Sequence, residues 1–137
     1  MSVVYTEITL ENPVDAGMAQ RGIIKETEVR KVTVNAMVDT GAWTLVMNED
    51  IRSKLGLRIE GKRETEIAGG AKETCGITGG VTIRWKDRFI TMNAAILPGE
   101  NDVLLGAFPL EGLDLIVHPR LEQVVGAHGD QPLHKIK

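Results

Sequence analysis

Apolar and polar residues alternate along short segments of this chain, and turn residues separate the segments. Val32, Val34, Ala36 and Val38, for example, fall on one face at a period of two. Valine, isoleucine and threonine favour strands, and the 15 glycines in 137 residues supply turns. The pattern therefore predicts a single, mainly β domain over residues 1–137, with little room for helices.

The first half of the chain is predicted to hold a strand and two extended stretches. The strand covers residues 3–10, and Asn12-Pro13 ends it in a turn that leads into a polar loop through Asp15 and Gly17. The extended stretches lie within residues 23–38. The second one runs directly into the tripeptide Asp39-Thr40-Gly41.

One helix is predicted over residues 48–55. Asn48 is a suitable N-cap, Glu49 and Asp50 place acids in the first turn, and Gly56 provides a left-handed stop. Residues 109–112 could add one helical turn. The remaining predicted strands cover residues 62–68, 74–85, 89–97, 103–105, 113–117 and 121–125, and a polar tail follows over residues 126–137.

Charge and composition narrow the class of partner. The chain has 16 basic and 19 acidic residues, so it lacks the basic excess that binding to nucleic acid favours. It also lacks an apolar run of about 18 residues and a leader-like start, which predicts a cytoplasmic protein without a membrane partner. With one cysteine, Cys75, no disulfide can form within the chain.

The tripeptide at the end of the apolar strand is the strongest candidate for chemistry. Asp39 offers a carboxylate, Thr40 offers a hydroxyl, and Gly41 allows a tight turn and a close approach to a ligand. Asp-Thr-Gly alone is also an ordinary turn sequence. Whether this tripeptide is functional therefore depends on the other motifs in the chain.

Three further segments, together with this turn, resemble the retropepsin-type single-domain aspartic proteases, relatives of pepsin that include the retroviral enzymes. Val38-Asp39-Thr40-Gly41-Ala42 matches the active-site strand and turn of that family. Ala68, Gly69, Gly70 and Ala71, about thirty residues later, stand at the tip of its flap hairpin. Leu104-Leu105-Gly106 matches the segment that packs beside the active-site turn, and Leu55-Gly56-Leu57 matches the end of its first half. The resemblance covers residues 20–125.

This resemblance implies a pepsin-like closed β-barrel with one or two short helices and a flap hairpin, acting as a homodimer. Peptide hydrolysis by this route needs two carboxylates that share one proton, because two like charges so close together cannot both ionise. The chain has no second Asp-Thr-Gly or Asp-Ser-Gly. We therefore expect an aspartic endopeptidase that cleaves extended peptides and in which Asp39 meets its copy across a two-fold axis. By the resemblance, Thr40, Gly41 and Ala42 support the turn, and no cofactor or metal is expected.

Two positions depart from the retroviral pattern. Ala107 follows the Leu-Leu-Gly segment where retroviral members carry an arginine that contributes to the dimer contact. Trp43 stands where those members often have a small acidic residue. A second hypothesis is therefore kept: a non-catalytic dimer of the same fold that binds a peptide or a partner protein and keeps Asp39 as a structural turn residue.

Other candidate sites are weaker. No histidine lies near Cys75 in sequence, so we expect it to be a small buried side chain rather than a nucleophile. The spacing of His118, His128 and His134 matches no common metal-ligand pattern. The glycines around residues 69–80 lack the Gly-Lys-Ser/Thr ending of a phosphate-binding loop. The scattered aromatic residues are expected in the core or at an interface.

Overall fold

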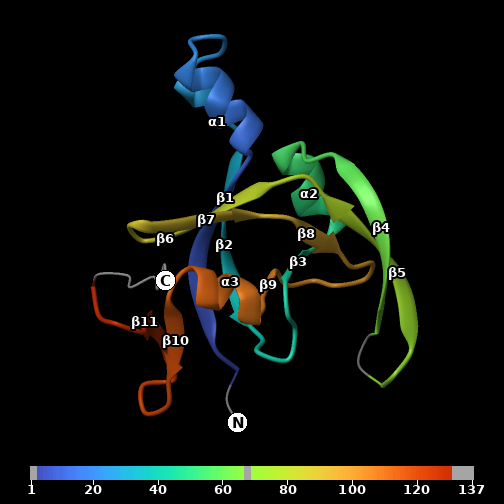
Figure 1. The fold of residues 1–137 in the computed structure, drawn as a ribbon, viewed down its shortest axis with the longest axis vertical. Helices are drawn as coiled ribbons and strands as arrows, with labels where there is room; N and C mark the ends of the chain where they lie inside the picture. Colours follow the sequence, from blue (N-terminus) through green and yellow to red (C-terminus); the bar gives the residue numbers. More distant parts are fainter. Residues whose placement is uncertain (1–2, 67–68, 131–137) are drawn as a thin grey trace, which may run out of the picture.

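One mixed β-sheet organises the protein and carries the candidate site (Figure 1). The structure, a computed structural model, describes residues 3–66 and 69–130. Within these residues the strands of this sheet follow the order β4-β5-β8-β3-β9-β2-β1-β6-β7. The strands are β1 (Tyr5–Glu11), β2 (Lys31–Val38), β3 (Leu45–Met47), β4 (Ile59–Glu66), β5 (Lys72–Thr78), β6 (Val81–Trp85), β7 (Arg88–Met92), β8 (Ala94–Ile96) and β9 (Leu104–Leu105).

The described helices are short and lie outside the sheet. They are α1 (Pro13–Gln20), the 3-10 turn η1 (Glu26–Glu28), α2 (Glu49–Leu55) and α3 (Ala107–Gly112). A separate antiparallel pair, β10 (Leu115–His118) and β11 (Gln123–Gly126), follows α3. None of the helices in the described parts of the chain has the length and apolar content that a bilayer crossing requires.

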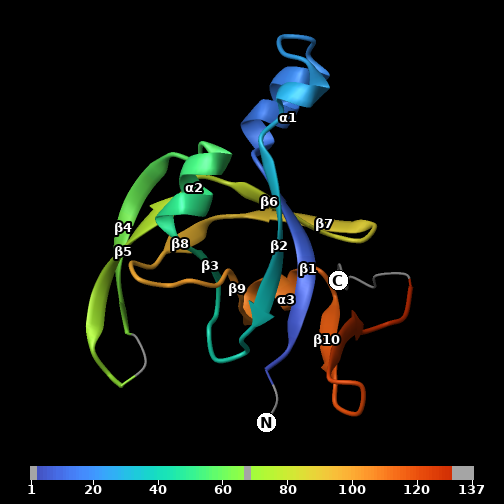
Figure 2. The same ribbon diagram turned by 180° about the vertical axis from the view of Figure 1, so that it is seen from behind.

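The fold is mostly β with few helices, as the sequence predicts, but the expected closed barrel is wrong. In the described residues the sheet has two separate edges, β4 and β7. The reason lies in the hairpin of β4 and β5, which pair with each other along their whole length. Among the described residues the hairpin is joined to the sheet at its base, where Gly76 and Ile77 of β5 pair with β8 and the Thr78 hydroxyl accepts from the amide of Ala94 at 3.0 Å. It therefore extends away from the body of the sheet instead of closing it (Figures 1 and 2).

Side chains from one face of the central strands form the main core. Val32, Val34 and Val38 of β2 pack against this core and Ala36 is fully buried, so the period-two prediction is confirmed. Leu10, Leu45 and Leu105 are also fully buried. Complete burial of such a side chain stabilises the fold by about 1.5–3 kcal/mol relative to exposure.

The predicted helix is confirmed, with both of its caps. The Oδ1 atom of Asn48 accepts a hydrogen bond from the amide of Ile51 at 2.9 Å, and Gly56 has a φ of 65°. The long segments predicted over residues 74–85 and 89–97 are each interrupted. Gly79 and Gly80 separate β5 from β6, and Asn93 separates β7 from β8.

The polar loop predicted after the first strand is wrong, because residues 13–20 form helix α1. Asn12 is the N-cap of this helix: its Oδ1 atom accepts hydrogen bonds from the amides of Val14 at 2.9 Å and Asp15 at 3.1 Å. Pro13 occupies the first helical position, where its missing N–H costs nothing. Asn-Pro therefore starts a helix here, whereas the prediction treated it only as the end of a strand.

Of the four aromatic residues expected in the core or at an interface, Trp85 is buried at 6% exposure. Trp43, Phe89 and Phe108 are exposed. Two of these exposed rings, Trp43 and Phe108, contact each other, with ring centroids 4.8 Å apart.

A buried carboxylate fixes the segment between β1 and β2. Asp15 accepts three hydrogen bonds from Arg30: from the backbone amide at 3.0 Å, from Nε at 2.8 Å and from NH2 at 3.0 Å. The hydrogen bonds from the Arg30 guanidinium lower the pKa of Asp15 below its ordinary value. The ionised Asp15 carboxylate therefore holds Arg30, at the end of this segment, close to helix α1 at its start.

We expect Asp15→Asn to destabilise the protein by about 1.5–3 kcal/mol at pH 7, because it weakens hydrogen bonds between charged groups. A carboxyl group whose pKa is lowered in the folded state stabilises the fold above its unfolded pKa, and this stabilisation is lost as the pH falls through the folded pKa. The difference in unfolding free energy should therefore shrink below about pH 4. Urea titrations from pH 7 to about pH 2.5 measure it, with Asp87→Asn at an exposed turn as the control; a constant difference would contradict the assignment.

Candidate active site

Asp39 lies directly after β2, in the loop that connects β2 to β3. Strand β9 lies between these two strands, parallel to β2 and antiparallel to β3. The amide of Asp39 donates to the carbonyl of Leu105 at 3.1 Å, which continues the β2–β9 pairing into the loop. The predicted segment at Leu104-Leu105-Gly106 is therefore next to the predicted Asp-Thr-Gly turn.

The Asp39 carboxylate is oriented by its own turn. Its Oδ1 atom accepts hydrogen bonds from the amides of Gly41 at 3.0 Å and Ala42 at 3.3 Å. Both bonds use the same oxygen. Asp39 is half-buried, while Thr40 and Gly41 are exposed, so the end of the turn is open to a ligand or a second chain.

Backbone hydrogen bonds from the start of α3 fix the Asp39 loop in place. The amides of Gly106, Ala107 and Phe108 donate to three consecutive carbonyls of residues 42–44: Gly106 to Thr44 at 3.1 Å, Ala107 to Ala42 at 2.9 Å and Phe108 to Trp43 at 3.0 Å. A Cβ atom at Gly106 would lie 2.5 Å from the Thr44 carbonyl oxygen and 2.7 Å from that of Ala42. Glycine is therefore required at this position by close backbone contact.

The β4–β5 hairpin is the predicted flap. Its tip lies at the same end of the molecule as the loop after β2 (Figures 1 and 2). Gly69 and Gly70 have φ values of 89° and 82°, in the left-handed region that favours glycine, and Ala71 is exposed. Ala68, the other predicted flap residue, lies outside the described residues.

A cleft of about 810 Å³ separates the Asp39 loop from the hairpin. Four of the predicted site residues line it: Asp39, Gly41, Ala42 and Leu104. Sequence analysis missed most of the other lining residues. All of these other residues come from the Asp39 loop, β3, β8, the hairpin and the loop before β9. They are Trp43, Thr44, Val46, Thr65, Glu66, Glu73, Cys75, Ala95, Leu97, Pro98, Gly99 and Glu100.

The register of the hairpin explains why these residues were missed. Thr65 of β4 is opposite Glu73 of β5, so both side chains share one face of the hairpin. The hydroxyl of Thr65 lies 3.1 Å from the Cys75 sulfur and also donates to the Glu73 carbonyl at 3.1 Å. Period-two alternation shows that Glu73 and Cys75 share a face, but only the pairing shows that this face is turned towards Asp39.

The cysteine and histidines have local roles. Cys75 is 1% exposed, which confirms the prediction of a small buried side chain. The Nδ1 atom of His118 accepts hydrogen bonds from the amides of Arg120 and Leu121, both at 3.2 Å. His128 lies 2.9 Å from the Asp114 carboxylate, and His134 lies outside the described residues.

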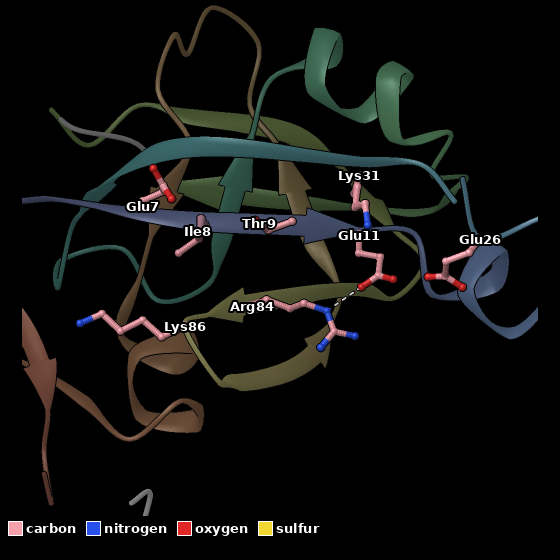
Figure 3. A pocket seen from close by; sticks show the side chains of 8 residues that line it. All are labelled: Glu7, Ile8, Thr9, Glu11, Glu26, Lys31, Arg84 and Lys86. Carbon is pink, nitrogen blue, oxygen red and sulfur yellow. Dashed lines mark hydrogen bonds and ion pairs between the residues drawn. The ribbon is translucent and has the colours of Figure 1, made fainter. Parts of the chain in front are cut away.

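A second, polar hollow of about 430 Å³ runs along β1 and β6 (Figure 3). Acidic and basic side chains share it, and Arg84 donates to Glu11 at 2.7 Å. Of the residues that the structure describes, this hollow contains none of the predicted site residues and none that line the cleft. We therefore place the candidate active site in the cleft at Asp39.

Comparisons with known proteins match most of this chain. The sequence model of a family described as Aspartyl protease matches residues 26–107, more than half of the chain. The solved retroviral protease-like domain of Ddi1 from Leishmania major is 14% identical and has a TM-score of 0.57, with coverage of 98% of this chain and 96% of that one. This similarity shows a shared fold.

Two other solved structures are similar over most of their length. EIAV protease in complex with the inhibitor HBY-793 is 24% identical, with coverage of 82% of this chain and 88% of that one and a TM-score of 0.49. A retropepsin-like aspartic protease from Rickettsia conorii is 18% identical, with coverage of 80% and 82% and a TM-score of 0.48. No curated protein matches this chain.

We expect Gly106→Ala to destabilise the protein by about 1–3 kcal/mol, because the added methyl group overlaps the carbonyls of Ala42 and Thr44. Urea unfolding measures this change. Gly17→Ala is the matched control: nothing lies within 4 Å of its added methyl group in helix α1, so it should stabilise by about 0.5–1 kcal/mol. Equal effects of both substitutions would refute the close-contact explanation.

Proposed function

This chain belongs to the aspartyl protease family, and we propose that it is an endopeptidase that cleaves extended peptides as a homodimer, with Asp39 as its catalytic residue. One observation carries the proposal: Asp39 lies on an open turn that faces the cleft beneath the hairpin. The backbone amides of Gly41 and Ala42 orient its carboxylate. A carboxylate held in this way has the geometry that a proton acceptor for water requires.

The proposed reaction uses the Asp39 residues of two chains and one water molecule. One carboxylate is ionised and accepts a proton from the water, whose oxygen attacks the scissile carbonyl carbon. The other is protonated and donates a hydrogen bond to the carbonyl oxygen. The carbon–nitrogen bond then breaks as the leaving amine takes up the proton that the first Asp39 accepted from the water, and the tetrahedral carbon becomes the new carboxyl group. No cofactor or metal has a role in these steps.

The single Asp-Thr-Gly motif implies a dimer, because the reaction needs two catalytic carboxylates. The chain carries one Asp-Thr-Gly and no Asp-Ser-Gly, and two chains related by a two-fold axis would supply two equivalent carboxylates. The exposure of Thr40 and Gly41 supports this arrangement, because the turn is free to meet its copy. By resemblance to retropepsins, the Thr40 hydroxyl would then form a hydrogen bond across the axis.

The peptide would lie between the Asp39 loop and the β4–β5 hairpin. An extended chain can form strand-like hydrogen bonds there while alternate side chains enter subsites. The glycines at the tip, Gly69 and Gly70, would let the hairpin open for entry and close over the bound peptide. Val46, Leu97 and Leu104 make part of the cleft apolar.

The second candidate is a dimer of this fold that binds a peptide or partner protein without cleaving it. The hydrogen bonds from the Gly41 and Ala42 amides to Oδ1 support this second candidate, because they are local turn contacts. The side-chain oxygen of an asparagine could also accept them. The two candidates differ in whether Asp39 also accepts a proton from water.

We expect Asp39→Asn to abolish peptide cleavage, because the amide keeps the size and the turn hydrogen bonds but cannot accept a proton from water. Purified protein is incubated with a complex peptide mixture between about pH 3 and 7, and mass spectrometry identifies new internal cleavages. Pepstatin is a second control, and Asp102→Asn controls for loss of a carboxylate elsewhere. Identical, empty profiles for wild type and Asp39→Asn would favour the non-catalytic dimer.

The dimer makes a separate prediction about mixtures. If each site uses one Asp39 from each chain, Asp39→Asn protein should inhibit wild type by forming inactive mixed dimers. An equal mixture of freely exchanging chains would then retain about half of the wild-type activity per wild-type chain. Co-purification of untagged wild type with an affinity-tagged Asp39→Asn protein confirms that exchange occurs; activity per wild-type chain that is unaffected by the variant would exclude a shared site.

A further inference from the structure

We propose that an apolar pocket beside the cleft is a distal subsite that binds a large apolar side chain of the peptide substrate. The proposal rests on the proposed function, because it takes the occupant to be the same peptide that lies at Asp39. We call it the Trp43–Phe108 pocket, after the two exposed rings on its wall. Its volume is about 530 Å³.

The walls of this pocket come from several parts of the fold. Trp43 belongs to the Asp39 loop, Phe108 to α3 and Ile77 to the base of the hairpin. Ile90 and Met92 of β7 complete the apolar wall, and both also pack against the main core. The pocket is therefore attached to the rigid body of the protein, not only to the hairpin.

The two aromatic rings are exposed although they are bulky and apolar. Trp43 is 63% exposed and Phe108 is 51% exposed, and their rings lie at 46° to each other with centroids 4.8 Å apart. The Phe108 amide also donates to the Trp43 carbonyl at 3.0 Å, and this hydrogen bond keeps the two residues side by side. A grouped, preorganised apolar surface of this kind is typical of a binding site.

Continuity with the cleft identifies the occupant. Trp43, Thr44, Thr65 and Ala95 line both the cleft and the pocket. An extended peptide advances about 3.3 Å per residue and turns successive side chains to opposite sides. A peptide whose scissile bond lies at Asp39 can therefore direct a side chain a few residues away into the pocket.

The chemistry of the walls favours an uncharged side chain. The cleft is lined by the carboxylates of Glu66, Glu73 and Glu100 besides that of Asp39. Among the described residues no acidic side chain lines the pocket, and its one charged residue is Arg63. Isoleucine, methionine and aromatic walls suit an aromatic or large aliphatic group. We therefore expect phenylalanine or a similar residue at one defined position of the substrate.

Peptide binding to the Asp39→Asn protein tests this subsite without depending on cleavage. The probes are ten-residue peptides of alanine and threonine with one phenylalanine placed at each position in turn, and the signal is the fluorescence of exposed Trp43. Trp43→Phe identifies the part of the signal that comes from this residue. We expect phenylalanine at one position to lower Kd by about tenfold or more relative to alanine.

Phe108→Ala should reduce that preference at least fivefold. Phe89→Ala, a matched change of an exposed phenylalanine on β7 outside the pocket, should leave it unchanged. The proposal is overturned if no peptide binds, if no position prefers phenylalanine, or if Phe108→Ala keeps the preference. It is also overturned if Phe108→Ala weakens dimer formation in sedimentation and leaves peptide preference intact, since the rings would then be a dimer contact.

The failure of this proposal can be told apart from failure of the proposed function. Position-dependent binding without cleavage by wild type would support the subsite and contradict the endopeptidase. Cleavage of peptides without any preference for a distal apolar residue would support the endopeptidase and contradict the subsite.

Discussion

The backbone hydrogen bonds between the Asp39 loop and the start of α3 are the contact on which the rest of the site depends. Three consecutive amides, from Gly106 to Phe108, donate to the carbonyls of residues 42–44. These bonds form only because residue 106 has no side chain, since a Cβ atom would overlap two of the carbonyl oxygens. Strand β9 places Gly106 there by pairing with both β2 and β3. The position of the carboxylate is thus decided by backbone packing.

These backbone hydrogen bonds also explain how the chain accommodates alanine at position 107, where the retroviral pattern has arginine. At position 107 the loop uses the amide, which alanine supplies as well as arginine does. Trp43 stands where retroviral members often have a small acidic residue, and its ring contacts that of Phe108 at a tilt of 46°. The Trp43–Phe108 pocket is one consequence of this difference at position 43.

The hairpin and the loop form the cleft from opposite sides, and they differ in how firmly they are held. The loop is fixed by α3 and β9, whereas the β4–β5 hairpin, over its described residues, is joined to the sheet at its base, through Gly76, Ile77 and Thr78. Almost all of β4 is exposed. A fixed acid opposite a loosely attached cover suits a site that must admit an extended peptide and then exclude water.

Local patterns in the sequence determined the β-rich class, helix α2 with its two caps, and the position of Asp39 at the end of a strand. These features depend on alternation, capping and turn chemistry among neighbouring residues. The helix over residues 13–20 also has a local signal, the Asn12 N-cap followed by Pro13 at the first helical position, although the prediction used this pair only as the end of a strand. Tertiary structure alone decided the open sheet and the face of the hairpin that meets the cleft. Both depend on pairing between strands, such as Ile77 with Ala95 and Thr65 with Glu73. Strand register and long-range hydrogen bonds leave no local pattern in a single sequence, which is why they emerge only when the chain is folded.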